Sequence, residues 1–397
     1  MSGLAYLFER FPSFTQTFCY REIAELRRQG VTPAIFSIRR PVNEPAQDWD
    51  RSFVREVTYL PDDEQLISEV DRAVRKKKLS EPIGREIKAW GRKTDFLRLY
   101  QAAFLGPRLQ ALGVRHVHAH FAGLAARTAF WIEQFFGIHF SFTGHANDIF
   151  APKPFEVSLG KLIGAAGAVV TVSDFGTRFL QSTYPEHAAR VHRIYNGIEL
   201  DRFKLADFTA TPPAIISIGR LIEKKGFSDL IEACRLLRAR GLDFRGEIIG
   251  EGPLENTLRE QITSGGLTNV IALAGPLPQR DVIERLAQAT VFALPCVAEA
   301  AGGMDNLPTV IMEAMAAGLP VVSTPLAGVP EMVQDGMTGL LVPEGQPLAL
   351  ANALGRLLTD PALTRSLGKA GHDRAQSFAI AQSARALRGL FSELVPR

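Results

Sequence analysis

The chain has 397 residues, more than one ordinary hydrophobic core needs, and this length suggests two or three domains. Charged residues make up 22% of it and the net charge is +3, which excludes a disordered chain and disfavours a nucleic-acid-binding protein. Its three cysteines, Cys19, Cys234 and Cys296, lack C-x-x-C spacing, so we expect no disulfide framework or structural zinc, and a cytoplasmic protein.

The beginning of the chain, MSGLAYLFERFPSF, lacks the basic start and long apolar core of a signal peptide. No run approaches ~20 uninterrupted apolar residues, so we expect no membrane-spanning helix. A lipid-linked substrate would then have to be reached from the membrane surface.

The first half of the chain alternates apolar runs typical of strands with helical patterns. The strand candidates are 4–8, 33–38, 54–60, 115–120, 138–143, 168–172 and 189–195. The helical patterns cover 15–28, 62–112 (with interruptions at Pro82 and Pro107), 123–136, 158–165 and 174–183. This alternation predicts a parallel sheet with helices on both faces.

A polar, aperiodic segment that ends in Pro212-Pro213 breaks this rhythm and indicates an interdomain linker. A second alternating series follows it. Its strand candidates are 214–219, 244–250, 270–275, 291–295, 320–324 and 338–342, with helical patterns between and after them. The expected fold class is therefore α/β, with two doubly wound sheets that bind ligands beyond the carboxyl ends of their strands, in a cleft between the domains.

The most informative segment is MDNLPTVIMEAMAAGLPVVST, over 304–324. Pro308 suits the first turn of a helix, and the small residues before it allow a ligand to come close. The free amides and the dipole of that helix make a candidate anion site. Asp305 and Glu313 would offer carboxylates to sugar hydroxyls. The alternative is an ordinary acidic bias at the start of a surface helix.

Basic residues follow the first strand of the second series. Arg220, Lys224 and Lys225, in SIGRLIEKKG, could clamp a diphosphate and stabilise its charge, or form a solvated basic loop. The Gly-rich turn GEGPLE, over 250–255, also follows a strand. G-x-G alone is a weak signal, and a simple turn before a helix explains it as well.

Histidines follow two strands of the first half. His116, His118 and His120 alternate along one strand, and His145 follows the next. Alternation places the first three on one face of a buried sheet, and we expect no carboxylate nearby to complete a ligand set, hence no metal site. The acidic pair in Asp48-Trp49-Asp50 resembles a metal motif, but it lies in a polar loop, which indicates chance.

The segment from Arg72 to Lys93 is rich in Lys and Arg. It could rest on anionic lipid headgroups, or be a solvated helix face. The sequence contains no G-x-S-x-G elbow, Walker loop or H-E-x-x-H motif.

Several of these segments together resemble glycosyltransferase family 4, in the branch that builds bacterial exopolysaccharides such as colanic acid. They are FPSFTQTFCYREI, HVHAHFA, SFTGHANDIF, YNGIELDRF, IGRLIEKKG, GEGPL and DNLPTVIMEAMAAGLPVVST. The resemblance covers nearly the whole chain and implies the GT-B fold, two Rossmann-like domains facing across a cleft. The implied acceptor domain covers 1–198, the linker 199–213 and the donor domain 214–377, and the helix 378–397 packs back on the first domain.

The resemblance also implies a nucleotide diphosphate sugar as donor, most simply a UDP- or GDP-sugar, with no cofactor and no metal. The implied catalytic residues are His145, Arg220, Lys225 and Asp305. The implied donor-binding residues are Gly250, Glu251, Leu277, Asn306, Leu307, Thr309 and Glu313. The implied acceptor-binding residues are Thr15, Gln16, Thr17 and His120. The chain departs from the family pattern in having Asp at 305 in place of Glu and Asn at 306 in place of Gly.

Family members retain the anomeric configuration, so the resemblance implies front-face transfer to a glycan, with a lipid-linked oligosaccharide as the natural acceptor. The enzyme would work in the cytoplasm or peripherally on the inner face of its membrane. Three other functions stay open. A nucleotide-sugar epimerase would convert the donor without an acceptor, a scaffold would bind without catalysis, and a dehydrogenase would need the full G-x-G-x-x-G that the first strand lacks.

Overall fold

The computed structural model describes residues 3–395, which form two compact units. Unit 1 contains Trp49–Tyr195, together with the described residues up to Glu44 and from Ser383 onward. Unit 2 contains Asn196–Gln382 and the short segment Pro45–Asp48. The ends of the expected acceptor domain and of the expected C-terminal helix, 1–2 and 396–397, lie outside the described residues.

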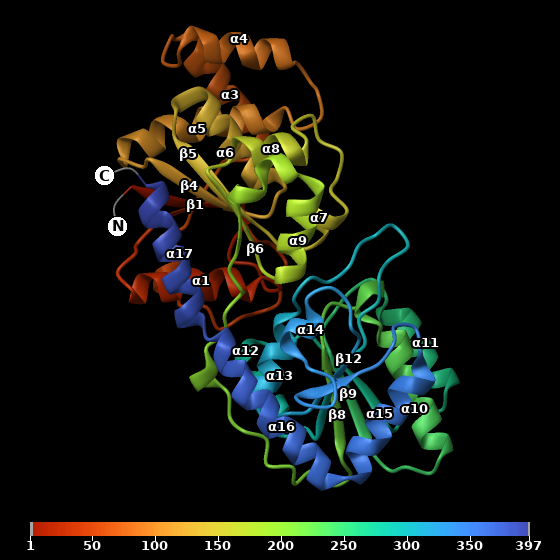
Figure 1. The fold of residues 1–397 in the computed structure, drawn as a ribbon. Coiled ribbons are helices and arrows are strands. Elements are labelled where there is room, and N and C mark those ends of the chain that lie inside the picture. Colours follow the sequence, from red (N-terminus) through yellow and green to blue (C-terminus); the bar gives the residue numbers. More distant parts are fainter. Residues whose placement is uncertain (1–2, 396–397) are drawn as a thin grey trace. The chain divides into compact units, whose positions relative to one another are not determined.

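Unit 1 is built on a seven-stranded sheet in the order β3-β2-β1-β4-β5-β6-β7, with every pair parallel (Figure 1). The strands are β1 (Leu4–Arg10), β2 (Ala34–Arg39), β3 (Thr58–Tyr59), β4 (His116–His120), β5 (His139–Gly144), β6 (Ala168–Thr171) and β7 (Val191–Arg193). The helices are α1 (Thr17–Arg28), α2 (Arg51–Arg55), α3 (Asp63–Arg75), α4 (Glu81–Trp90), α5 (Leu97–Ala111), α6 (Leu124–Phe136), α7 (Asn147–Phe150), α8 (Leu159–Ala165) and α9 (Asp174–Thr183). This order of strands is that of a Rossmann-type sheet.

Side-chain alternation along β1 divides the core of unit 1 between the two faces of the sheet. Ala5 and Leu7 belong to the apolar cluster that contains buried residues of α3 to α6. Tyr6 and Phe8 belong to the other cluster, which contains buried residues of α1 and of the last helix, α17 (Ile380–Leu394). Figure 1 shows α1 and α17 on the same side of the sheet. The end of the chain therefore completes the core around its beginning.

Unit 2 is built on a six-stranded parallel sheet in the order β10-β9-β8-β11-β12-β13. The strands are β8 (Ala214–Ile218), β9 (Arg245–Ile249), β10 (Ile271–Gly275), β11 (Val291–Leu294), β12 (Val321–Ser323) and β13 (Gly339–Leu341). The helices are α10 (Phe227–Ala239), α11 (Glu255–Ser264), α12 (Gln279–Ala287), α13 (Thr309–Ala316), α14 (Val329–Met332), α15 (Pro347–Thr359) and α16 (Pro361–Ala375). The α/β fold class with two doubly wound sheets is confirmed.

Two local expectations were wrong. The run 54–60 is not one strand, because Asp50 accepts a hydrogen bond from Ser52 N and caps the short helix α2, which leaves only Thr58–Tyr59 for β3. Pro107 does not interrupt its helix, because α5 continues through it. The burial of most of α5 compensates for the one backbone hydrogen bond that a proline removes.

The unit boundaries also differ from the expected ones. The segment 196–213 belongs to unit 2, where Ala206 N donates to Ala317 O at 2.8 Å and Ile198 N donates to Phe378 O at 2.9 Å. The segment Pro45–Asp48 joins unit 2 because Gln47 Oε1 accepts from Gln279 N at 2.7 Å. Among residues 3–395, every helix is too short or too polar to cross a bilayer.

Candidate functional site

In unit 2, the loops that follow neighbouring strands are joined by backbone hydrogen bonds. Gly219 N donates to Ile249 O at 3.0 Å, and Leu221 N donates to Glu251 O at 2.8 Å. Gly250 N donates to Gly275 O at 2.9 Å. These bonds connect the loops after β8, β9 and β10 at the carboxyl edge of the sheet. The segments that carry Arg220, Glu251 and Leu277 are therefore parts of one surface, where a doubly wound sheet binds its ligand.

Two glycines allow neighbouring loops at this edge of the sheet to lie in direct backbone contact. Gly226 has φ +67°, and a Cβ built on it would lie 1.8 Å from Pro295 O. Gly250 has φ +143°, and a Cβ there would lie 1.9 Å from Gly219 O. Any side chain would push the backbone of the next loop away. The predicted donor residue Gly250 is thus needed for the shape of the loop.

Asp305 lies between two lysines of the loop after β8. Lys224 Nζ is 3.2 Å from Asp305 Oδ1, and Lys225 Nζ contacts the other carboxylate oxygen more closely. The three side chains are only 12–13% exposed. Cys296 Sγ lies 4.0 Å from the same carboxylate. The structure therefore brings together Lys225 and Asp305, for which the sequence predicted contacts with different parts of the donor.

The charges of this cluster support one another. Although burial opposes ionisation, Lys225 and Lys224 hold the pKa of Asp305 below its ordinary value. Burial opposes the charge of Lys225 too, but Asp305 raises the pKa of Lys225 above its ordinary value. Both groups are therefore charged at neutral pH. Lys225 has three N–H donors, so it can bind Asp305 and a phosphate oxygen at the same time.

The helix α13 starts at Thr309 and carries Glu313 on a buried face. Glu313 is 3% exposed, and its Oε2 lies 3.4 Å from Gln279 Nε2, at the start of α12. Just before α13, Asn306 and Leu307 are buried, and Asn306 O accepts a hydrogen bond from Gly328 N at 2.8 Å. The residues before and inside this helix are thus held by neighbouring loops. Arg220, in contrast, is exposed at the surface.

In unit 1, His145 follows β5 and lies against two aromatic rings. Its ring centroid is 4.8 Å from that of Phe18 and 4.4 Å from that of Phe121. Its backbone N donates to Asp148, whose carboxylate also accepts from Ala122 N at 2.9 Å. Asp148 therefore ties the loop after β4 to the loop after β5 and fixes the position of His145.

The predicted acceptor residues differ in their exposure. Thr15 is exposed, and Gln16 and Thr17 at the start of α1 are half-buried. His120 is fully buried, and both of its ring nitrogens face protein atoms. The structure argues against direct contact of His120 with an acceptor, because neither nitrogen is left to reach one.

The histidines of β4 face α17, since Phe391 packs against the rings of His116 and His118. The expectation that no carboxylate lies nearby was wrong, because Glu22 Oε1 is 3.1 Å from His120 Nε2. Within residues 3–395, Glu22, His118 and His120 form a group that could hold a metal ion. Both nitrogens of His118 already contact hydroxyls, Ser141 Oγ at 2.8 Å and Thr143 Oγ1 at 2.9 Å. The group is therefore satisfied by protein hydrogen bonds.

The remaining candidate motifs have structural explanations. Asp48 pairs with Arg202 at 3.2 Å, and Asp50 caps α2, which agrees with chance as the origin of the acidic motif. The segment Arg72–Lys93 covers the end of α3 and the whole of α4. It exposes its basic side chains, whereas Ile83 and Ile87 pack into the core.

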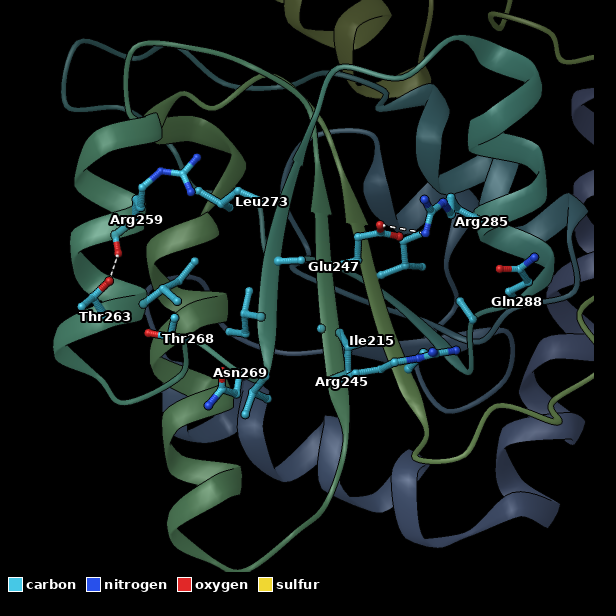
Figure 2. A pocket seen from close by; sticks show the side chains of 18 residues that line it. Ile215, Arg245, Glu247, Arg259, Thr263, Thr268, Asn269, Leu273, Arg285 and Gln288 are labelled. Carbon is cyan, nitrogen blue, oxygen red and sulfur yellow. Dashed lines mark hydrogen bonds and ion pairs between the residues drawn. The ribbon is translucent and has the colours of Figure 1, made fainter.

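A groove of about 530 Å³ lies on unit 2, along the amino-terminal parts of β8, β9 and β10 (Figure 2). Arg285 extends over it and pairs with Glu247 at 3.2 Å. Arg259 lines it from the other side. None of the candidate donor residues lines this groove. It is separate from the surface at the carboxyl ends of the strands.

Comparison with known families gives a match over most of the chain. Residues 15–202 match Glycosyltransferase Family 4, and residues 199–374 match Glycosyl transferases group 1. The chain joins a family 4 domain to a group 1 domain. The family 4 domain contains His120 and His145, and the group 1 domain contains the Lys225–Asp305 pair and Glu313.

The names of two curated relatives refer to amylovoran and to colanic acid biosynthesis. The chain is 42% identical over 172 residues to the amylovoran biosynthesis glycosyltransferase AmsK of Erwinia amylovora. This match covers 43% of this chain and 42% of that protein. It is 41% identical over 214 residues to the putative colanic acid biosynthesis glycosyltransferase WcaL of Escherichia coli, over 52% of each. The chain thus spans about half the length of the curated relatives it matches.

Among solved structures, HepE of Anabaena in complex with UDP has a TM-score of 0.73 at 17% identity. The match covers 99% of this chain and 100% of that one. This likeness confirms the GT-B fold of the family 4 and group 1 domains.

Proposed function

We propose that the protein is a retaining glycosyltransferase of exopolysaccharide synthesis, which moves a sugar from a nucleotide diphosphate sugar to a glycan acceptor. The observation that carries this proposal is the buried Lys225–Asp305 pair at the carboxyl edge of the group 1 sheet. Cations at such an edge suit a diphosphate, and a carboxylate beside them suits sugar hydroxyls. The names of AmsK and WcaL support the reaction class, and the UDP complex of HepE supports a nucleotide diphosphate as donor.

In this proposal, the donor lies on the group 1 domain. Arg220 and Lys225 bind the diphosphate, and the amides at Asn306 and Leu307, with the start of α13 at Thr309, bind phosphate oxygens. Glu313 binds the ribose, and Gly250, Glu251 and Leu277 lie by the base. Asp305, held by two lysines, accepts hydrogen bonds from the transferred sugar. The base is that of a UDP- or GDP-sugar.

The proposed transfer is a front-face displacement. The bond between the anomeric carbon and the diphosphate oxygen breaks while the acceptor oxygen bonds to the same face of the sugar. The departing phosphate oxygen takes the proton of the acceptor hydroxyl, so no separate protein base is needed. Arg220 and Lys225 stabilise the charge that develops on the diphosphate. His145 positions the sugar, and Thr15, Gln16 and Thr17 lie by the acceptor, for which we propose a lipid-linked oligosaccharide.

The direct test is incubation of the protein with labelled UDP- and GDP-sugars and a lipid-linked glycan, followed by NMR of the product. We expect a new glycosidic bond with the configuration of the donor. An inverted linkage would exclude the proposed mechanism. Conversion of the donor without acceptor would indicate an epimerase, and binding without turnover would indicate a scaffold.

We also propose that the reaction needs no metal, because the positive charge at the diphosphate comes from side chains and a helix start. The rate should therefore be the same with EDTA as with added magnesium. A rate that collapses with EDTA and returns with a divalent ion would contradict this part.

A further inference from the structure

A chain of buried hydrogen bonds leads from Glu22 to His145 within unit 1. Glu22 Oε1 lies 3.1 Å from His120 Nε2, and His120 Nδ1 lies 3.0 Å from His145 Nε2. The three residues come from α1, from the end of β4 and from the loop after β5. They are 9%, 0% and 6% exposed, so water cannot easily replace these contacts. Each bond must therefore be made by a defined donor and a defined acceptor.

The direction of the first bond follows from the carboxylate. An ionised Glu22 only accepts, so Nε2 of His120 carries a proton. Tyr6 OH donates to the same oxygen at 2.7 Å and holds the carboxylate in place. In a neutral ring, Nδ1 of His120 is then an acceptor. The thiol of Cys19 lies 3.5 Å from this nitrogen. Burial and the nearby Glu22 raise the pKa of that thiol, so it keeps its proton. Its S–H group can therefore also donate to Nδ1 of His120.

The second bond passes this constraint on to His145. Because Nδ1 of His120 accepts, Nε2 of His145 must donate and carry the ring proton. Burial and the neighbouring His120 lower the pKa of His145 well below its ordinary value, so the ring is neutral. Its Nδ1 is then a bare acceptor, and none of the hydrogen bonds found among residues 3–395 uses it.

We propose that Glu22 and His120 are positioning residues that hold His145 as the Nε2–H tautomer, so that Nδ1 accepts a hydrogen bond from a hydroxyl of the substrate sugar. The rings of Phe18 and Phe121 keep the imidazole in place. The hydrogen-bonded chain Glu22–His120–His145, here called the relay, fixes which nitrogen of that ring carries the proton. The sugar as ligand rests on the proposed function, whereas the tautomer rests on unit 1 alone. His120 acts through His145 and not by contact with the acceptor.

The opposite arrangement is chemically distinct. If His120 were doubly protonated, its Nδ1 would donate to Nε2 of His145, and His145 would carry its proton on Nδ1. That ring would then donate to the sugar and not accept from it. The two arrangements give different nitrogen chemical shifts for protonated and unprotonated ring positions.

The test is a long-range 1H–15N NMR spectrum of the full chain with 15N-labelled histidine, at neutral pH. Single variants of His120 and His145 assign the signals. We expect both residues to carry the proton on Nε2 and a bare Nδ1. A proton on Nδ1 of His145 would overturn the relay. This measurement needs neither substrate nor a Glu22 variant, so it decides the relay even if the chain is not a glycosyltransferase.

The kinetic test compares Glu22→Gln with Glu25→Gln, a second buried glutamate of the same helix that lies outside the relay. The side-chain amide that Glu22→Gln introduces can donate to His120 and release the fixed tautomer. We expect kcat of Glu22→Gln to fall about 10- to 100-fold with the donor KM unchanged, by analogy with the range for hydrogen-bond partners that orient metal-ligating histidines. Its histidine spectrum should show mixed tautomers, and Glu25→Gln should match the parent in both.

An unchanged kcat in folded Glu22→Gln would contradict the proposal. A lower kcat with unchanged tautomers would contradict it as well, because it would indicate a packing role. If the parent chain transfers no sugar to any acceptor, the proposed function fails, while the NMR spectrum still decides the tautomer. If Glu22→Gln does not fold, the spectrum of the parent chain remains the deciding result.

Discussion

Asp305 combines two roles at the residue scale, as a partner of two lysines and as the proposed ligand of sugar hydroxyls. Its folded-state pKa is lowered, so its contribution to stability is present above the ordinary carboxyl pKa and is lost as the pH falls through the folded value. The pKa of Lys225 is raised, so its contribution is present below the ordinary lysine pKa and is lost as the pH rises through the folded value. Between about pH 5 and about pH 9, the pair stays charged and should cause no pH dependence of stability.

Asp305→Asn would remove the charged carboxylate that pairs with two nearly buried ammonium groups. We expect it to lower the free energy of unfolding of unit 2 by about 3 kcal/mol, since breaking a buried ion pair by removing one member is costly. Thermal unfolding at pH 7 measures this change. The matched control is Asp373→Asn, because the Asp373 side chain is 63% exposed in its pair with Lys369. This variant should lower the free energy of unfolding by less than ~1 kcal/mol. Equal effects of the two variants would show that the Asp305 pair is not buried in solution.

At this scale, the sequence predicted residue types better than partners. Spacing and position beyond strands singled out Asp305, Glu313, Lys225 and His145. The pairing of Lys225 with Asp305 was not predictable, because it depends on how two loops from different strands fold together. Glu22 was missed for the same reason, since 98 positions separate it from His120 and no local pattern links a helix face to a strand end.

At the scale of elements, glycines in the loops of the proposed donor site should tolerate substitution less well than glycines of similar conformation elsewhere. Gly250→Ala places a Cβ against Gly219 O, so we expect loss of thermal stability and weaker nucleotide binding. Gly241 also has positive φ, at +78°, but a Cβ there meets nothing within 4 Å. Gly241→Ala should therefore cost only the backbone strain, about 1 kcal/mol, and leave nucleotide binding unchanged. Equal loss of binding in both variants would refute the loop-contact explanation.

The last helix provides a second element that can be tested. Phe391 of α17 is fully buried against Tyr6 and His118 of the central strands. We expect Phe391→Ala to destabilise unit 1 by about 3–5 kcal/mol. Leu348→Ala, at a residue that is 55% exposed, serves as the control and should cost less than ~1 kcal/mol in a thermal melt. A stable Phe391→Ala variant would mean that α17 does not complete this core.

Helices and strands were predictable where apolar runs were clear. The prediction was wrong where one local interaction decided whether a segment is helix or strand. The strands β1 and β8 followed directly from their buried apolar runs. The cap by Asp50 placed the first two residues of an expected strand, Val54 and Arg55, in α2, and the burial of α5 allowed that helix to continue through Pro107. Neither effect can be weighed from periodicity alone, because both depend on contacts with the rest of unit 1.

At the scale of the whole molecule, the surface charge of unit 1 makes a prediction about membranes. Lys76, Lys77 and Lys78 are exposed between α3 and α4. If the acceptor is lipid-linked, this segment should draw the protein to anionic vesicles in a salt-sensitive way. Replacing the three lysines by alanine should abolish co-sedimentation with phosphatidylglycerol vesicles at low salt. Lys369→Ala, an exposed lysine of unit 2, should not. Undiminished binding of the triple variant would exclude the segment as the membrane contact.

The division into two doubly wound sheets was predictable from two alternating series around a Pro-Pro break. The unit boundaries were less so, because 45–48 and 196–213 join unit 2 through hydrogen bonds with residues far along the chain. The division of substrates between the two domains remains a prediction.

Calorimetric titration of the full chain with UDP and GDP, with and without EDTA, tests the proposed donor site most directly. We expect saturable binding of one of them, unaffected by EDTA, and a loss of at least ~10-fold in affinity in Lys225→Ala and in Glu313→Ala. Lys369→Ala should bind as the parent does. Parent-like binding by folded Lys225→Ala and Glu313→Ala, or no binding of either nucleotide by the parent chain, would contradict a donor site built on the Lys225–Asp305 pair and α13.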